Sequence, residues 1–161
     1  MCCRMYGRKD AWRKAGWGRD PMEAEPGGKI PIRTGKGTYL AIWGGIPKQG
    51  ESIQGHARSE TLQSRWLDKP AEAGCSKWNP VDIIGVKLFA ERNTIGEDKD
   101  RNEIVRFTMP DDSVIKGIAR TVTLAKGTKV IDVRVITEKS EGAVAPIHRR
   151  MPMVRVPEHT D

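Results

Sequence analysis

Residues 130–137, Val-Ile-Asp-Val-Arg-Val-Ile-Thr, form the clearest strand signal in the chain. The apolar residues at 131, 133 and 135 alternate with Asp132 and Arg134. A period of two is typical of a β-strand that has one apolar face and one polar face. The segment therefore predicts a sheet with an apolar core on one side, and the rest of the chain is arranged around it.

Further strands are predicted on both sides of this segment. Towards the N-terminus we expect a buried strand from Val81 to Phe89 and a hairpin that turns at residues 34–37, with arms Ile30 to Arg33 and Thr38 to Trp43. Strands from Glu103 to Met109 and from Ser113 to Leu124 are separated by the turn sequence Pro110-Asp111-Asp112.

The remaining segments predict little regular structure. Ser59 is a plausible N-cap for a short helix through Leu67, residues 1–28 are expected to be irregular, and residues 92–101 are expected to form a charged exposed loop. The prediction is an α+β fold. It is a single β-rich domain over residues 1–157, with mostly antiparallel strands, a few short helices and a flexible tail at 158–161.

Charge and cysteine content limit the possible partners. The net charge is +7 in 161 residues, and residues 1–50 hold ten Lys and Arg against four Asp and Glu. Such an excess suits a polyanion such as DNA, although RNA or an acidic protein fits as well. Three irregularly spaced cysteines predict neither a disulfide framework nor a metal site. The sequence has no signal peptide and no long apolar run, so the expectation is a cytoplasmic protein without membrane contact.

Five short blocks carry the most specific signal. In chain order they are Met1-Cys2-Cys3-Arg4, residues 41–47 (Ala-Ile-Trp-Gly-Gly-Ile-Pro), residues 57–61 (Ala-Arg-Ser-Glu-Thr), Phe89-Ala90-Glu91, and residues 145–152 (Ala-Pro-Ile-His-Arg-Arg-Met-Pro). Their order and content resemble the signature blocks of the SRAP (SOS response-associated peptidase) family. The resemblance implies an SRAP-like fold and covalent crosslinking of the protein to abasic sites in single-stranded DNA, which shields the lesion in the DNA damage response.

Cys2 is suited to that chemistry. Removal of Met1 leaves a 1,2-aminothiol, whose amine condenses with an aldehyde and whose thiol then closes a thiazolidine ring. An α-amino group titrates at about 7.7–8.0, so part of it is neutral and nucleophilic near pH 7. A free thiol, with a pKa of about 8.5, is only partly ionised and benefits from a nearby cation such as Arg4.

The resemblance also implies roles for other residues. Glu91 matches the family's catalytic acid and His148 its histidine for ring opening and proton transfer. Arg4 and Arg58 match residues that bind DNA phosphates. Two further DNA-binding positions are Trp43, which matches an aromatic residue beside the DNA path, and His56, which replaces the family's asparagine. No metal, cofactor or small-molecule ligand is implied, and we expect a monomer in the cytoplasm, associated with the nucleoid if it is bacterial or viral.

Two other functions remain open. Cys2, Glu91 and His148 suit a thiol peptidase that removes its own first residue. The basic charge also suits a non-covalent nucleic-acid-binding protein with an inactive site. Without the resemblance, Trp43 between Ile42 and Gly44 is more typical of a core residue, and His148 of a structural histidine.

Overall fold

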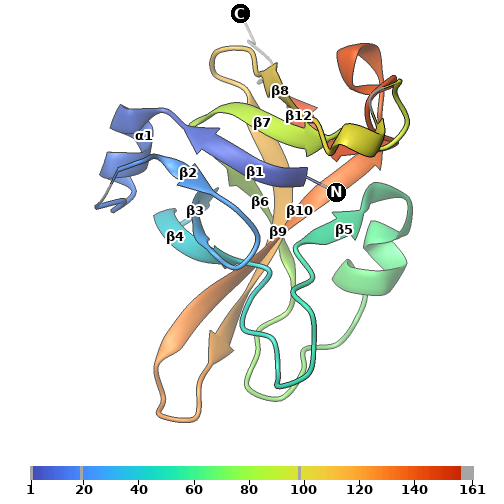
Figure 1. The fold of residues 1–161 in the computed structure, drawn as a ribbon. Helices are drawn as coiled ribbons and strands as arrows, with labels where there is room; N and C mark the ends of the chain where they lie inside the picture. The colour runs from blue at the N-terminus through green and yellow to red at the C-terminus, as the bar shows by residue number, and fades with distance from the viewer. Residues whose placement is uncertain (1, 19, 98, 157–161) are drawn as a thin grey trace, which may run out of the picture.

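Two β-sheets make up most of the molecule in the computed structural model, which describes residues 2–18, 20–97 and 99–156, with the backbone alone for Cys2 and Cys3 (Figure 1). The smaller sheet has the strand order β2-β1-β7-β8, and the larger has the order β11-β10-β4-β3-β6-β9-β12, with β5 added to β10. The predicted β-rich α+β class is confirmed. The predicted tail at 158–161 lies outside the described residues.

The larger sheet closes on itself. Its strands are β3 (Lys29–Thr34), β4 (Gly37–Trp43), β5 (His56–Arg58), β6 (Asn79–Ile83), β9 (Val114–Thr123), β10 (Lys129–Lys139), β11 (Arg150–Pro152) and β12 (Val154–Arg155). β10 pairs with β9 on one side and with β4 on the other, so β10, β4, β3, β6 and β9 form a closed ring of strands. Most pairings are antiparallel, whereas β4 and β5 run parallel to β10.

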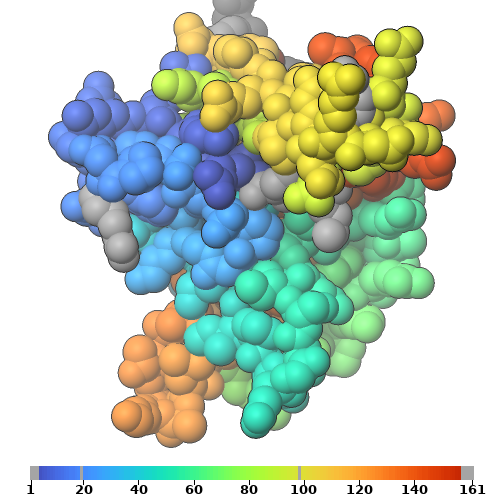
Figure 2. All heavy atoms as spheres, in the orientation of Figure 1, coloured from blue at the N-terminus to red at the C-terminus, as the bar shows by residue number. Residues whose placement is uncertain are grey.

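The smaller sheet joins β1 (Cys2–Gly7), β2 (Glu23–Ala24), β7 (Val86–Arg92) and β8 (Ile104–Thr108). The helix α1 (Lys9–Lys14) follows β1 and places Trp12 in the core, fully buried with Met5 and Ile30. The loop between β4 and β5 and the hairpin between β9 and β10 project together at the end of the molecule away from α1 (Figures 1 and 2).

The short helices all lie outside the sheets. They are the 3₁₀ turns η1 (Ser59–Thr61), η3 (Lys99–Arg101) and η4 (Gly142–Val144) and the π-helical turn η2 (Gln63–Leu67). None of the helices in the described ranges has the length and apolar content needed to cross a membrane.

The hairpin of β3 and β4 and the strands at 104–108 and 114–123 confirm the sequence predictions. The single strand predicted from Val81 to Phe89 is wrong. The chain breaks at Gly85, which has φ +69°, and β6 and β7 lie in different sheets. A Cβ at Gly85 lies 2.7 Å from Cβ of Ala11, so only glycine fits this turn against α1.

Two other expectations are also corrected. Residues 1–28 contain β1, α1 and β2, because the pairing of β1 with β7 orders a segment whose local pattern is weak. The segment after Arg58 forms η1 and η2 instead of a regular helix, and Ser59 makes no capping hydrogen bond.

The polar face predicted for residues 130–137 is not exposed. Asp132 and Arg134 are 3% and 9% exposed, and the Nε and Nη2 atoms of Arg134 donate to Asp132 at 3.0 and 3.1 Å. β10 is therefore covered on both faces. The alternating pattern predicts that Asp132 and Arg134 contact water, and in the structure the two charges bond to each other instead.

Candidate functional site

Strand pairing places Cys2 beside a buried carboxylate. β1 runs antiparallel to β7, with Cys2 opposite Glu91, and the register shifts between Cys2 and Arg4. Glu91 is fully buried. Met1, whose removal the crosslinking chemistry requires, and the side chain of Cys2 lie outside the described part of the chain.

His148 faces the same carboxylate from the other end of the sequence. It follows η4, is 7% exposed, and its Nε2 lies 3.8 Å from Oε2 of Glu91. Its Nδ1 lies 2.8 Å from the carbonyl oxygen of Arg150 and 3.2 Å from the backbone nitrogen of Arg150. A protonated Nδ1 donates to that carbonyl, and an unprotonated Nδ1 accepts from that N–H. Burial lowers the pKa of His148, against the opposing effect of the bond to Arg150. Burial thus favours the neutral ring, whose Nε2 faces Glu91.

His56 lies near this pair. β5 places it opposite Val135 of β10, and its ring packs edge-on against Trp43 with the centroids 6.0 Å apart. Burial lowers the pKa of His56 to about 4, and the positive charge of Arg134 acts in the same direction. Nε2 of His56 is buried and has no hydrogen-bond partner among the described residues. His56 is therefore a neutral ring with an unused polar atom at the edge of the site.

An ion pair holds two of the sequence blocks together. Arg150, from the last block, donates to both carboxylate oxygens of Glu60 at 2.8 and 2.9 Å, and to the carbonyl oxygen of Thr137 at 2.7 Å. The bond from Arg150 lowers the pKa of Glu60 to about 2. Arg150 and Glu60 are 90 positions apart in the sequence, and their ion pair joins the two segments. It therefore holds His148 and Arg58, which lie two residues before them, on neighbouring segments.

Trp43 does not fit the role of a base-stacking residue. Its side chain is 0% exposed, and its Nε1 donates to the carbonyl oxygen of Gly55 at 3.0 Å. A base has no access to either face of the ring. Trp43 is a core residue, and it supports the backbone that leads into His56.

Arg4 and Arg58 lie in different surroundings. Arg4 pairs with Glu23 at 3.4 Å and with Glu25 at 3.2 Å, and the bond to Glu25 is the main cause of its raised pKa. Arg58 is exposed at the end of β5 and lines a groove that also includes His56. Arg4 is not among the residues that line this groove.

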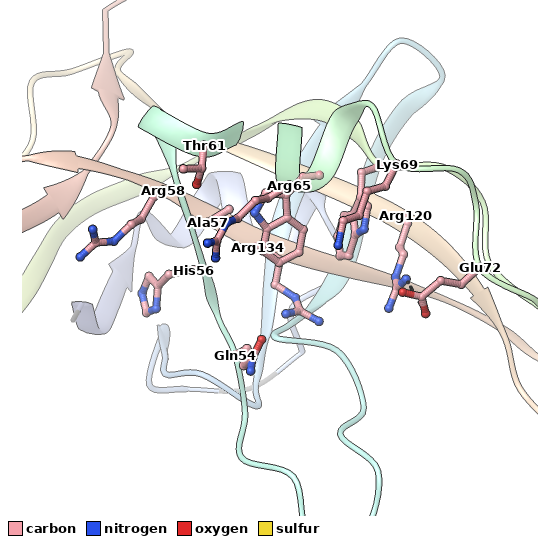
Figure 3. Close-up of a pocket in the computed structure, with 12 residues that line it drawn as sticks. Gln54, His56, Ala57, Arg58, Thr61, Arg65, Lys69, Glu72, Arg120 and Arg134 are labelled. Atoms are coloured by element: carbon pink, nitrogen blue, oxygen red, sulfur yellow. Dashed lines mark ion pairs between the residues drawn. The ribbon is translucent and has the colours of Figure 1, made fainter. Parts of the chain in front are cut away.

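The groove has a volume of about 430 Å³ and a strongly basic lining. Its cations are Arg58, Arg65, Lys69, Arg120 and Arg134, and its acidic residue is Glu72. Figure 3 shows Arg58 and His56 at one end, Arg120, Glu72 and Lys69 at the other, and Arg65 and Arg134 between them.

Two half-buried tryptophans complete the lining. Trp66 and Trp78 meet edge to face with their centroids 5.2 Å apart. The guanidinium of Arg120 lies 4.5 Å from the Trp78 ring, and that of Arg134 lies 5.3 Å from Trp78 and 5.6 Å from Trp66. Such contacts fix the orientation of the arginine head groups before any ligand arrives.

The groove residues from Arg65 to Arg134 were not predicted from the sequence. The basic excess was expected in residues 1–50, but four arginines of that segment have carboxylate partners: Arg4, Arg8, Arg13 and Arg33. A local signal was present in the basic–aromatic pairs Arg65-Trp66 and Lys77-Trp78. Cations beside aromatic rings are typical of surfaces that bind single-stranded nucleic acid.

Comparisons with known proteins show similarity of fold alone. No protein-family model matches the chain, and a comparison with curated proteins gave no match. A crystal structure of a Bordetella bronchiseptica protein superimposes with a TM-score of 0.65 and 18% identity, over 95% of this chain and 83% of the other. A Bacteroides thetaiotaomicron protein gives a TM-score of 0.62 and 15% identity, over 95% and 76%. Both are structural-genomics structures described without a function.

Proposed function

We propose that this protein crosslinks its own N-terminal cysteine to abasic sites in single-stranded DNA, as members of the SRAP family do. The observation that carries the proposal is the convergence of three residues from distant blocks. Cys2 lies opposite Glu91 in the β1–β7 pairing, and Nε2 of His148 lies 3.8 Å from the Glu91 carboxylate. An aminothiol beside a buried acid–base pair is what aldehyde capture requires.

The reaction needs no oxidant and releases one water molecule. After Met1 is removed, the neutral amine of Cys2 attacks C1 of the ring-opened deoxyribose. The nitrogen loses one proton and the aldehyde oxygen takes one, which gives a carbinolamine. Its hydroxyl takes a second proton and leaves as water while the nitrogen loses its other proton, and an imine forms. The thiol then gives up its proton, its sulfur attacks the imine carbon, the nitrogen takes a proton, and the thiazolidine ring closes.

Glu91 and His148 supply and remove these protons. Both side chains are less than a tenth exposed, so bulk water has little access to them. In the tautomer whose Nδ1 donates to the carbonyl oxygen of Arg150, neutral His148 offers Nε2 as the proton acceptor. Glu91 in its protonated form is the donor for the departing hydroxyl.

The basic groove supports single-stranded DNA as the partner. It begins at His56 and Arg58, next to the proposed reaction centre, and carries five cations against one carboxylate. Guanidinium groups pair well with phosphate oxygens, and aromatic rings among the cations accommodate bases of any sequence.

The test is a denaturing gel of the purified protein with a single-stranded oligonucleotide that carries one abasic site. A shifted band is expected for the wild type and for Cys75→Ala, which removes a free cysteine outside the site. No band is expected for Cys2→Ala or for an undamaged oligonucleotide. Intact mass measurement confirms Met1 removal in each sample. A band that persists in Cys2→Ala refutes the aminothiol mechanism and points to an imine formed by a lysine.

The groove also favours a second function, non-covalent binding of nucleic acid. In that case the protein shows no band on the denaturing gel although Met1 has been removed. It still binds single-stranded DNA, with an affinity that falls steeply as salt rises.

A further inference from the structure

The end of the basic groove away from His56 has features that aldehyde capture does not use. It is formed by Arg120 and Lys69 beside the half-buried Trp66 and Trp78. A carboxylate, Glu72, lies against it, with Oε2 3.5 Å from Nη1 of Arg120 (Figure 3).

The orientation of Arg120 is fixed from two sides. Its Nε lies 3.4 Å from Oδ2 of Asp132, and its guanidinium lies 4.5 Å from the Trp78 ring. The side chain is only 16% exposed, so most of the water that an arginine head group normally holds has been removed. Arg120 is therefore preorganised to bind an oxyanion through Nη1, the atom that Glu72 approaches.

Glu72 is a weak occupant of this position. Its side chain is 76% exposed, and the separation of 3.5 Å is long for a charge-assisted hydrogen bond. An exposed pair of this kind contributes little to stability. Asp132 differs, because it is buried and also bonded to Arg134, and it therefore stays in place.

We propose that Arg120, together with Lys69, binds a backbone phosphate of single-stranded DNA, and that Glu72 occupies this position in the free protein. The choice of DNA as the polyanion rests on the proposed function. In this arrangement the strand that presents the lesion near His56 continues along the groove. Glu72 lowers the affinity for undamaged DNA, because each binding event must first displace it.

Equilibrium binding of a fluorescent undamaged oligonucleotide tests the proposal. All proteins carry Cys2→Ala, so covalent chemistry plays no part. Glu72→Gln is expected to tighten binding at low salt by up to about fivefold, which corresponds to the upper range for an exposed ion pair. The control Asp10→Asn removes one exposed negative charge from α1, away from the groove.

A salt titration provides the second measurement. Lys69→Gln is expected to reduce the slope of log K against log salt by about 0.7, the value for one phosphate contact on a single strand. Lys14→Gln in α1 is the matched control and leaves the slope unchanged. Lys69 and Lys14 are both exposed, so neither variant is expected to disturb folding.

Equal effects of Glu72→Gln and Asp10→Asn overturn the proposal, because they reveal a response to net charge alone. An unchanged slope for Lys69→Gln overturns it as well. These results are separate from the crosslinking test. A missing gel band together with the expected slopes refutes covalent capture but supports the phosphate site. A normal band with unchanged slopes does the reverse.

Discussion

The substitution Trp43→Phe separates a core role from a DNA-binding role at this position. It removes the hydrogen bond from Nε1 to the carbonyl oxygen of Gly55, which contributes about 0.5–1.5 kcal/mol to the free energy of unfolding. The carbonyl keeps its second donor, the N–H of Val135 at 2.8 Å, so no buried acceptor loses all its partners. The smaller ring also leaves a cavity, and core truncations of similar size cost about 0.5–1.5 kcal/mol.

The expected loss of stability is therefore about 1–3 kcal/mol. Urea unfolding followed by circular dichroism measures it, with an unchanged m-value. In a domain of this size the melting temperature falls by about 2–4 °C for each kcal/mol. The affinity of the folded Cys2→Ala/Trp43→Phe protein for single-stranded DNA is expected to stay within twofold of the Cys2→Ala parent. Unchanged stability with a tenfold weaker affinity refutes the reasoning, because that is the result for a ring that stacks on a base.

Four further predictions follow from the site and the fold. Arg58→Ala is expected to weaken DNA binding by about 1.5–3 kcal/mol, the range for a hydrogen bond to a charged group, and unchanged affinity in a fluorescence titration excludes a phosphate contact. Glu91→Gln is expected to slow adduct formation on a timed denaturing gel without changing the affinity for undamaged DNA; equal rates remove Glu91 from the mechanism. The pKa of His56 falls from 6.5 to about 4 on folding, so the unfolded chain binds the extra proton between these values. The stability that neutral His56 provides is then full above pH 6.5 and is lost as the pH falls towards 4. His56→Asn is expected to flatten the pH dependence of the free energy of urea unfolding in that window. Parallel curves of unfolding free energy against pH for the variant and the wild type contradict this. Gly85→Ala is expected to destabilise the fold by more than about 1 kcal/mol, because φ is +69° and the added Cβ lies 2.7 Å from Cβ of Ala11, and a melting temperature equal to that of the wild type refutes it.

Local pattern was sufficient for the strands whose signal lies in adjacent residues. The alternation at 130–137 predicted β10, and the turn residues at 34–37 predicted the hairpin of β3 and β4. The sequence blocks likewise named Glu91, His148, His56 and Arg58 as candidate site residues, and these assignments stay predictions. Each of these predictions depends on neighbouring side chains or on short motifs, which a single sequence records directly.

Tertiary contacts decided what such patterns do not contain. β1 forms because β7 pairs with it, although the two strands are about 80 residues apart and residues 1–28 have a weak local pattern. Burial of both faces of β10 turned Asp132 and Arg134 from an expected surface pair into an internal one. A period of two reports the direction of a side chain, but it does not report what packs on each side.

The candidate site shows the same division. The sequence supplies the chemical groups: a cysteine at position 2, a carboxylate, imidazoles and arginines. Only the fold decided that Trp43 is buried, that Arg4 is paired with Glu23 and Glu25, and that five cations line a groove with Trp66 and Trp78. The physical reason is that the carboxylates and aromatic rings around a cation set its charge balance and its orientation, and those neighbours come from segments distant in the sequence.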